Sequence, residues 1–388
     1  MAAIVDRIRT THAGALPRSP ELTAMVRAKS EGRPYDPAEY ERRLGQEVTA
    51  IVRRQAALGL DGVNDGELSK TSFLHYSMER IAGFEIQEYR PGGPQPLSIA
   101  ARDLTKFREY FEAGHGGFVG AELPKSGPVC VGPLTYVGET ELKRDIANFK
   151  AALDKTAVGE AWLPANSPGT LEHALRNAHY PGEEAYLEAL GEVLRVEYKA
   201  ITEAGLLLQI DDPDLPDGWL MYPEMTVPEY RRYAGLRVEA LNHALRGIPR
   251  EQIRLHVCWG SFKGPHQDDI PLRDIIDLIF KVKAASYSIE ASNPAHEHEW
   301  QLFESVRLPE GAVLIPGVIG HCTDFIEHPD LVAQRLVRYA GLVGRENVIG
   351  STDCGIGPRV KHPKIAWAKL GALVEGARRA TKQLWGRA

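Results

Sequence analysis

The chain has 388 residues, of which 43% are hydrophobic and 25% are charged, so it has the composition of an ordinary globular protein with enough chain for a large core. Its formal net charge of −6 and isoelectric point near 6.1 give no reason to expect binding to nucleic acid or to an anionic membrane. No apolar segment follows a basic start, and no apolar run approaches a membrane span. We therefore expect a cytoplasmic protein.

Nine short apolar runs end abruptly in polar, Gly-rich or Pro-rich residues, and amphipathic stretches of helical period separate most of them. The clearest helices are expected over 37–59, 183–205 and 328–344. Strands that alternate with helices indicate parallel βαβ units. The nine runs are 8–14, 61–67, 127–133, 161–169, 206–213, 253–260, 286–293, 313–322 and 348–355.

These units predict one catalytic domain over residues 1–388, an α/β fold built as a (β/α)8 TIM barrel. A doubly wound open sheet is the competing fold, but no GxGxxG follows the first strand. Nine runs exceed the eight places of a barrel, so one of them lies outside it. Residues 84–126 are rich in Pro and Gly, and we expect them to form an insertion or lid after the second strand.

Four cysteines are few for this length, and without a signal peptide we expect them to be reduced. For Cys130 and Cys322 the expected role is to fill core volume. Cys258 and Cys354 differ, because each follows a predicted strand among other polar residues. The carboxyl ends of barrel strands carry the active site in essentially every known case.

His256 and Cys258 are two residues apart on a predicted strand, so both side chains lie on one face. Glu290 ends the next strand and Cys354 ends the last one. Two thiolates, an imidazole and a carboxylate suit tetrahedral zinc. A thiolate-rich zinc is a poor generator of hydroxide but well suited to hold a substrate thiol as thiolate. A zinc hydrolase and a binding protein with structural zinc are the alternative classes.

Three further groups accompany the predicted metal site. Asp353 precedes the ligand Cys354 and is expected to orient a neighbouring ligand. Arg18 and Lys70 are either surface charges or partners for an anionic substrate. His296 and His298 resemble a second metal site, but an HEH sequence in a loop is more often exposed, and we expect these two to be exposed.

Seven segments together resemble one family in order and over nearly the whole chain. The chain is similar to the C-terminal catalytic barrel of cobalamin-independent methionine synthase and to its short single-barrel relatives, which include the epoxyalkane:coenzyme M transferases. The matching segments are THAGALPR (11–18), DGELSKTSF (65–73), QIDDP (209–213), HVCWG (256–260), IEASN (289–293), GVIGH (317–321) and STDCGIG (351–357).

The resemblance implies a methyltransferase that activates homocysteine as a zinc thiolate and gives methionine. It implies zinc ligation by the four residues named above and a general acid at His321. It also implies that Glu67 and Asp211 bind the substrate amino group, and that the backbone of Ala13, Gly14 and Ala15 binds its carboxylate. Charge-assisted hydrogen bonds and a Gly-containing turn suit these two tasks.

The chain departs from the family pattern at Leu134, where the folate-stacking Trp is expected, and at Ala15, where the family has Ser. The expected partners are a small-molecule thiol and an alkyl donor, with a corrinoid methyl-donor protein as one candidate. Opening of an epoxide by coenzyme M or a related thiol is the alternative reaction, and Arg18 or Lys70 would then bind the sulfonate.

Overall fold

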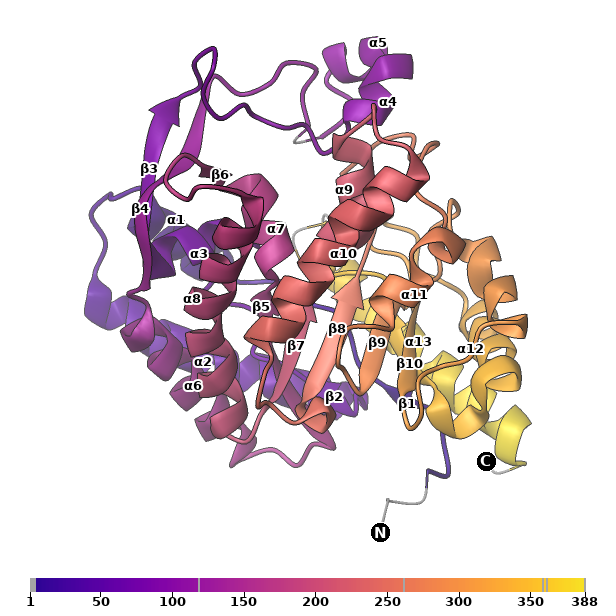
Figure 1. Ribbon diagram of the computed structural model, residues 1–388. Coiled ribbons are helices and arrows are strands. Elements are labelled where there is room, and N and C mark those ends of the chain that lie inside the picture. The colour runs from indigo at the N-terminus through magenta and orange to yellow at the C-terminus, as the bar shows by residue number, and fades with distance from the viewer. Residues whose placement is uncertain (1–4, 118, 261, 358, 361, 387–388) are drawn as a thin grey trace.

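The computed structural model describes residues 5–117, 119–260, 262–357, 359–360 and 362–386 (Figure 1). Phe118, within the predicted insertion, lies outside these ranges. At the centre, eight strands form a parallel sheet in the order β1-β11-β10-β9-β8-β7-β5-β2. They are β1 Arg9–Thr10, β2 Gly62–Val63, β5 Glu160–Asn166, β7 Leu207–Asp211, β8 Ile253–Val257, β9 Ser286–Glu290, β10 Val313–Ile319 and β11 Ile349–Thr352.

The two end strands of this sheet approach each other and nearly close it into a barrel. The backbone N–H of Asp61, just before β2, donates to the carbonyl of Thr10 in β1 at 2.9 Å. The Thr11 hydroxyl donates to the carbonyl of Gly62 at 3.1 Å. The predicted TIM-barrel fold is confirmed.

The predicted helices over 37–59, 183–205 and 328–344 are confirmed as α2, α8 and α12, and helices surround the barrel strands. The longer helices are α1 Pro20–Ser30, α2 Pro37–Leu58, α6 Glu139–Leu153, α8 Glu183–Glu203, α10 Val227–Ala244, α12 Pro329–Val343 and α13 Pro363–Trp385. The shorter ones are α3 His75–Arg80, α7 Pro168–Ala174, α9 Asp214–Met221 and α11 Ile276–Ile279. The 3₁₀ helices are Arg250–Gln252, Leu272–Asp274, Glu297–Glu304 (η3) and Arg345–Asn347.

Local sequence accounts for the limits of α2. The Asp36 carboxylate accepts hydrogen bonds from the N–H groups of Ala38 and Glu39, and Pro37 occupies the first turn. Gly59 ends the helix in a left-handed conformation, with φ of 99°. Leu44, Val48 and Val52 recur at helical spacing and are buried against the barrel, which explains why this amphipathic stretch packs where it does.

The run 127–133 is the one that lies outside the barrel. It belongs to β4 Ser126–Tyr136, which pairs antiparallel with β3 Ile81–Glu88 and parallel with β6 Arg176–Asn177. Only three residues of β4, namely Val129, Cys130 and Tyr136, are buried, whereas barrel strands are buried along most of their length. A strand with one solvated face fits a small side sheet rather than the barrel wall.

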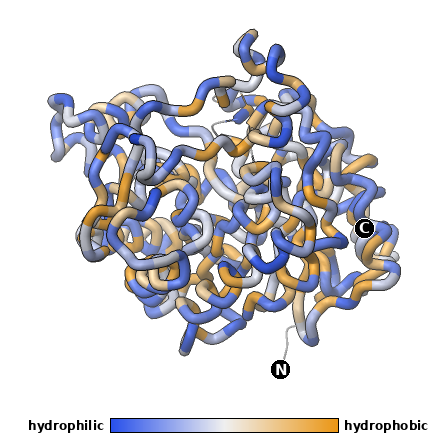
Figure 2. Tube along the Cα trace, turned by 45° about the horizontal axis from the view of Figure 1, so that its top comes forward, coloured by the Kyte–Doolittle hydropathy of each residue, from blue (hydrophilic) through white to orange (hydrophobic). Residues whose placement is uncertain are grey.

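The segment between β3 and β4 carries α4 Ala101–Lys106 and α5 Arg108–Glu112, at the top of Figure 1 above the carboxyl ends of the barrel strands. A small apolar cluster fastens it to the barrel, and Arg102 donates to the carbonyls of Trp219, Tyr222 and Met225. Figure 2 shows that the outlying loops are largely hydrophilic. Among the described residues, helices long and apolar enough to cross a membrane are absent.

Candidate functional site

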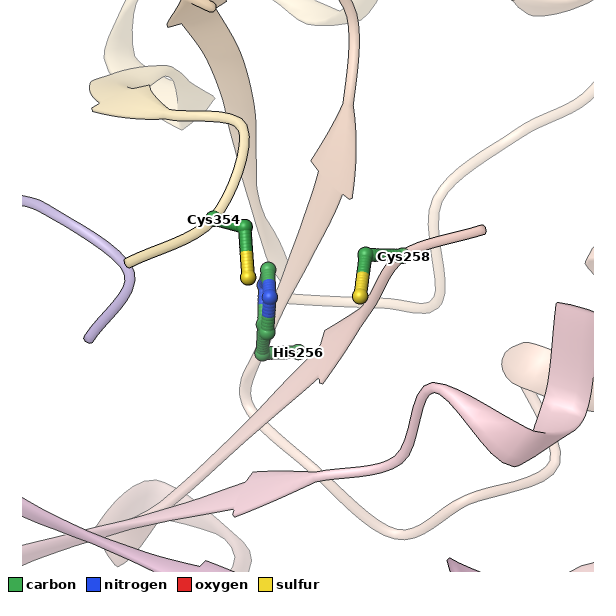
Figure 3. Close-up of side chains that lie close together, drawn as sticks. All are labelled: His256, Cys258 and Cys354. Atoms are coloured by element: carbon green, nitrogen blue, oxygen red, sulfur yellow. The ribbon is translucent and has the colours of Figure 1, made fainter. Parts of the chain in front are cut away.

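The structure brings together three of the four predicted metal ligands. One ligand atom each from His256, Cys258 and Cys354 lies within 4.8 Å of the other two. In Figure 3 the ring of His256 and the two sulfurs face a common space; His256 lies near the end of β8 and Cys258 just beyond it, while Cys354 follows β11. Residues two apart on one strand and a residue from a distant strand therefore meet at the carboxyl end of the barrel.

The three side chains form a group that could hold a metal ion. Nδ1 of His256 lies 3.1 Å from the hydroxyl oxygen of Ser288, which leaves Nε2 buried with no oxygen or nitrogen partner. The hydrogen bond between the two thiols lowers the pKa of Cys354 and raises that of Cys258. Two sulfurs and an imidazole nitrogen that converge in this way fit a thiophilic metal such as zinc.

Glu290, the fourth predicted ligand, lines the same space without being as close to all three. Its Oε2 lies 3.4 Å from the Asn293 amide, and its buried Oε1 has no hydrogen-bond partner. That oxygen lies 3.7 Å from Nδ1 of His321, which is likewise buried and without a hydrogen bond. Burial raises the pKa of Glu290 well above its ordinary value and lowers the pKa of His321 to about 4.

Asp353 lies beside Cys354 and is bonded to the end of β9. Its Oδ1 accepts from the N–H groups of Ala291 and Ser292 at 2.9 and 3.1 Å, and its Oδ2 accepts from the Ser292 hydroxyl at 2.5 Å. Burial raises the pKa of Asp353 to about 6 against the lowering effect of these hydrogen bonds. The side chain therefore joins the strand end of Cys354 to that of Glu290.

The acids Glu67 and Asp211 are both buried near the metal-ligand candidates. Burial raises the pKa of each, and the pKa of Asp211 reaches about 7 because the neighbouring Glu67 adds to the effect. Glu67 has φ of 55°, a left-handed conformation that costs energy for a residue with a side chain. The Asp65 carboxylate holds it there by accepting from the Glu67 N–H at 2.9 Å.

The turn of Ala13, Gly14 and Ala15 packs against the same acids. A Cβ on Gly14 would lie 3.2 Å from Oε1 of Glu67, so glycine permits this approach. Gln209 connects the groups, because its amide donates to the carbonyl of Ala13 and to Oδ1 of Asp211, each at 2.8 Å. Gln209 is not among the predicted site residues, although its position two residues before Asp211 places both side chains on one face of the strand.

The two cations considered for a sulfonate are bonded elsewhere. Nζ of Lys70 donates to the carbonyl of Pro164 at 2.7 Å and lies 3.9 Å from Glu67. Arg18 donates to the carbonyl of Lys70 at 2.9 Å. Lys70 is buried and Arg18 half-buried, so neither is a free surface charge.

Comparison with known proteins identifies the family of this chain. The sequence profile described as "Cobalamin-independent synthase, Catalytic domain" matches residues 8–90 and 175–379. The chain belongs to this family. The prediction of an enzyme of this family is thereby confirmed, and the unmatched stretch contains α4, α5 and β4.

Relatives of two lengths share the family. The chain is 24% identical to a 5-methyltetrahydropteroyltriglutamate–homocysteine methyltransferase of Vibrio vulnificus over 96% of its length, but spans only 42% of that protein. It is 22% identical to a methionine synthase of Thermococcus kodakarensis, covering 97% of this chain and 94% of that one. A solved B12-independent methionine synthase from Shewanella, in complex with selenomethionine, has the same fold, with TM-score 0.73, 20% identity and coverage of 98% and 100%.

Two predictions around the family's site are wrong. Cys322 is exposed rather than part of the core, and its sulfur lies 3.1 Å from Nε2 of His321. His296 is buried at 3% exposure, whereas His298 is exposed as expected. The prediction for Cys130 is confirmed, since this thiol is buried in the main apolar core.

Proposed function

We propose that this chain is a zinc-dependent methyltransferase that transfers a methyl group to the thiol of homocysteine and gives methionine. The observation that carries the proposal is the convergence of His256, Cys258 and Cys354 within 4.8 Å at the carboxyl end of the barrel. The buried acids Glu67 and Asp211 nearby supply a second recognition element. Family membership supports the same reaction class.

His256, Cys258 and Cys354 would hold the zinc, with Glu290 as the fourth ligand and the one to be displaced. When bound, zinc lowers the pKa of the substrate thiol and so supplies a nucleophilic sulfur near neutral pH. Two buried atoms favour this assignment: Nε2 of His256 has no oxygen or nitrogen partner, and Oε1 of Glu290 has no hydrogen-bond partner, whereas buried polar atoms normally have one.

Substrate orientation falls to the acids and the N-terminal turn. Glu67 and Asp211 accept hydrogen bonds from the substrate ammonium, and the N–H groups of Gly14 and Ala15 receive its carboxylate, since the N–H of Ala13 donates to the Thr352 hydroxyl at 3.0 Å. Gln209 fixes the position of the turn relative to Asp211, because its amide donates to the carbonyl of Ala13 and to the Asp211 carboxylate. Held at three points, the thiol faces the methyl donor in one geometry, which is how positioning lowers the barrier.

The proton balance assigns a role to His321. The thiol gives up its proton on binding the zinc, before its sulfur bonds to the methyl carbon, and the donor's leaving atom gains a proton. An ionised Glu290 at 3.7 Å would favour protonation of His321 against the burial that lowers the pKa of its ring. His321 would then give its proton to the leaving group. Asp353 would act as a positioning residue, since its carboxylate bonds to the strand end that follows Glu290.

The environment of Arg18 and Lys70 favours an amino-acid thiol over coenzyme M. Both side chains donate to backbone carbonyls, and Lys70 also faces Glu67, so a sulfonate at this point would meet acids rather than free cations. Methylfolate and a corrinoid methyl-donor protein stay alternative predictions for the donor. A methyl-transfer assay with each would separate them.

The experiment is calorimetric titration of the zinc-loaded protein with L-homocysteine, with coenzyme M in parallel. We expect homocysteine to bind with release of a proton, and neither effect in Cys258→Ser. Binding of coenzyme M alone would replace the proposal with epoxide opening. Binding of neither thiol would overturn thiol activation as the function.

A further inference from the structure

An ionic network that the proposed function does not use lies beside the metal-ligand candidates. Nε2 of His296 is 2.8 Å from Oδ2 of Asp269, and Nδ1 is 3.0 Å from Oε2 of Glu299. Both ring nitrogens face carboxylates, which accept only, so both carry protons and the ring is a cation. Burial alone would lower the pKa of His296, but these two hydrogen bonds outweigh it and raise the pKa to about 9.

The charged ring stacks on Trp259. The two ring centroids are 3.8 Å apart and the planes meet at 22°. Trp259 is fully buried, and its Nε1 donates to the carbonyl of Ile270 at 2.8 Å. A buried cation is attracted to the face of an indole, so the stacked ring of His296 holds Trp259 in place.

Trp259 is the middle residue of the turn that follows the ligand candidate Cys258. The N–H of Gly260 donates to the sulfur of Cys258, so one hydrogen bond closes the turn around Trp259. Gly260 has φ of 77°, and a Cβ there would lie 2.9 Å from Oδ1 of Asp217. The turn therefore requires glycine, and its direction is fixed by the indole of Trp259 and by the carboxylate of Asp217.

We infer that His296, held by Asp269 and Glu299, is a positioning residue that acts through Trp259 to aim the Gly260 N–H at the Cys258 sulfur. Hydrogen bonds to a ligating sulfur tune its strength as a ligand, so the network sets how Cys258 holds a metal. The inference rests on the proposed function, in which Cys258 is a zinc ligand.

The same network extends to the insertion. Asp269 also lies 3.0 Å from Nδ1 of His266, whose backbone N–H donates to Oδ2 of Asp103 in α4 at 3.1 Å. Asp103 is fully buried, so α4 packs against the barrel at this hydrogen bond. The insertion and the Cys258 turn are thus supported by the same buried carboxylate.

The test uses the full chain loaded with cobalt(II), whose absorption reports sulfur ligation without any thiol substrate. His296→Phe keeps a ring for stacking but loses the charge and both hydrogen bonds, and Asp269→Asn removes one charge at equal size. His243→Phe is the matched control, since it breaks an imidazole–carboxylate contact of 2.8 Å on the surface, with Glu192.

We expect both network variants to bind cobalt about tenfold more weakly and to shift the thiolate-to-cobalt absorption band, with the control unchanged. Unchanged affinity and band in the variants, even with a lower Tm, would reduce the network to a structural role and overturn the inference. If His296→Phe fails to fold, Asp269→Asn decides alone. A wild-type chain without a thiolate–cobalt band would instead refute the proposed function, and the inference with it.

Discussion

Two buried histidines near the carboxyl ends of neighbouring barrel strands differ in what their rings face. His256 on β8 uses Nδ1 for a serine hydroxyl, while its Nε2 has no oxygen or nitrogen partner and lies among two sulfurs. His296, in the segment after β9, has a carboxylate at each nitrogen. The ring of His256 therefore keeps one nitrogen without an oxygen or nitrogen partner, whereas both ring nitrogens of His296 are hydrogen-bonded.

The difference separates binding groups from supporting ones. A buried polar atom without a partner costs free energy, so it persists where a ligand supplies the partner. Oε1 of Glu290 and Nδ1 of His321 are likewise buried without a hydrogen bond, and the two atoms lie 3.7 Å apart. In Asp353 and His296, by contrast, both polar atoms of the side chain are hydrogen-bonded. Their contacts support the strand ends that carry Glu290 and His256.

Removal of one of the proposed zinc ligands should have the largest effect on activity. We expect Cys354→Ser to lose zinc and methyl transfer while the barrel stays folded, because a hydroxyl is a poor replacement for a thiolate ligand. Metal analysis, activity and circular dichroism measure the three quantities. Cys322→Ser is the control, since that thiol is exposed and outside the ligand group, and it should keep its zinc. Full zinc content in Cys354→Ser would show that buried atoms without hydrogen-bond partners do not mark a metal site here.

The approach of His256, Cys258 and Cys354 could be predicted from sequence. Residues two apart on one strand lie on one face, and parallel barrel strands bring their carboxyl ends to the same end of the barrel, where the three side chains meet. Residues 127–133 have the composition of a barrel strand, and only the tertiary pairing with β3 shows otherwise. One partner of His296, Glu299, lies three residues away, but the other, Asp269, lies 27 residues away, so the HEH sequence itself does not predict that His296 is buried.

Removal of one substrate-binding acid should have an intermediate effect. We expect Asp211→Asn to weaken homocysteine binding about 10- to 100-fold with zinc retained, because a hydrogen bond to a charged group contributes about 1.5–3 kcal/mol. Asp211 binds the ammonium as a carboxylate and has a pKa of about 7, so wild-type affinity should rise as the pH passes 7.

Calorimetric titration at several pH values measures both effects. The variant should lose the part of the pH dependence that comes from Asp211, along with affinity, and keep the part that comes from release of the thiol proton. Asp212→Asn is the adjacent control, because the Asp212 carboxylate bonds to Ser167 instead. An Asp211→Asn variant with wild-type affinity would remove this acid from the site.

The smallest expected effect is on thermal stability and concerns His296. The pKa of His296 is about 9 in the folded chain against an ordinary 6.5, so the folded state binds its proton more tightly. The stability that this provides is full below about pH 6.5 and is lost as the pH rises through 9. From pH 7 to 9.5, Tm of the wild type should therefore fall about 2 °C more than Tm of His296→Phe. His243→Phe should follow the wild type. Equal slopes in all three proteins would mean that the His296 charge does not contribute to folding, and the contrast with His256 would then rest on metal binding alone.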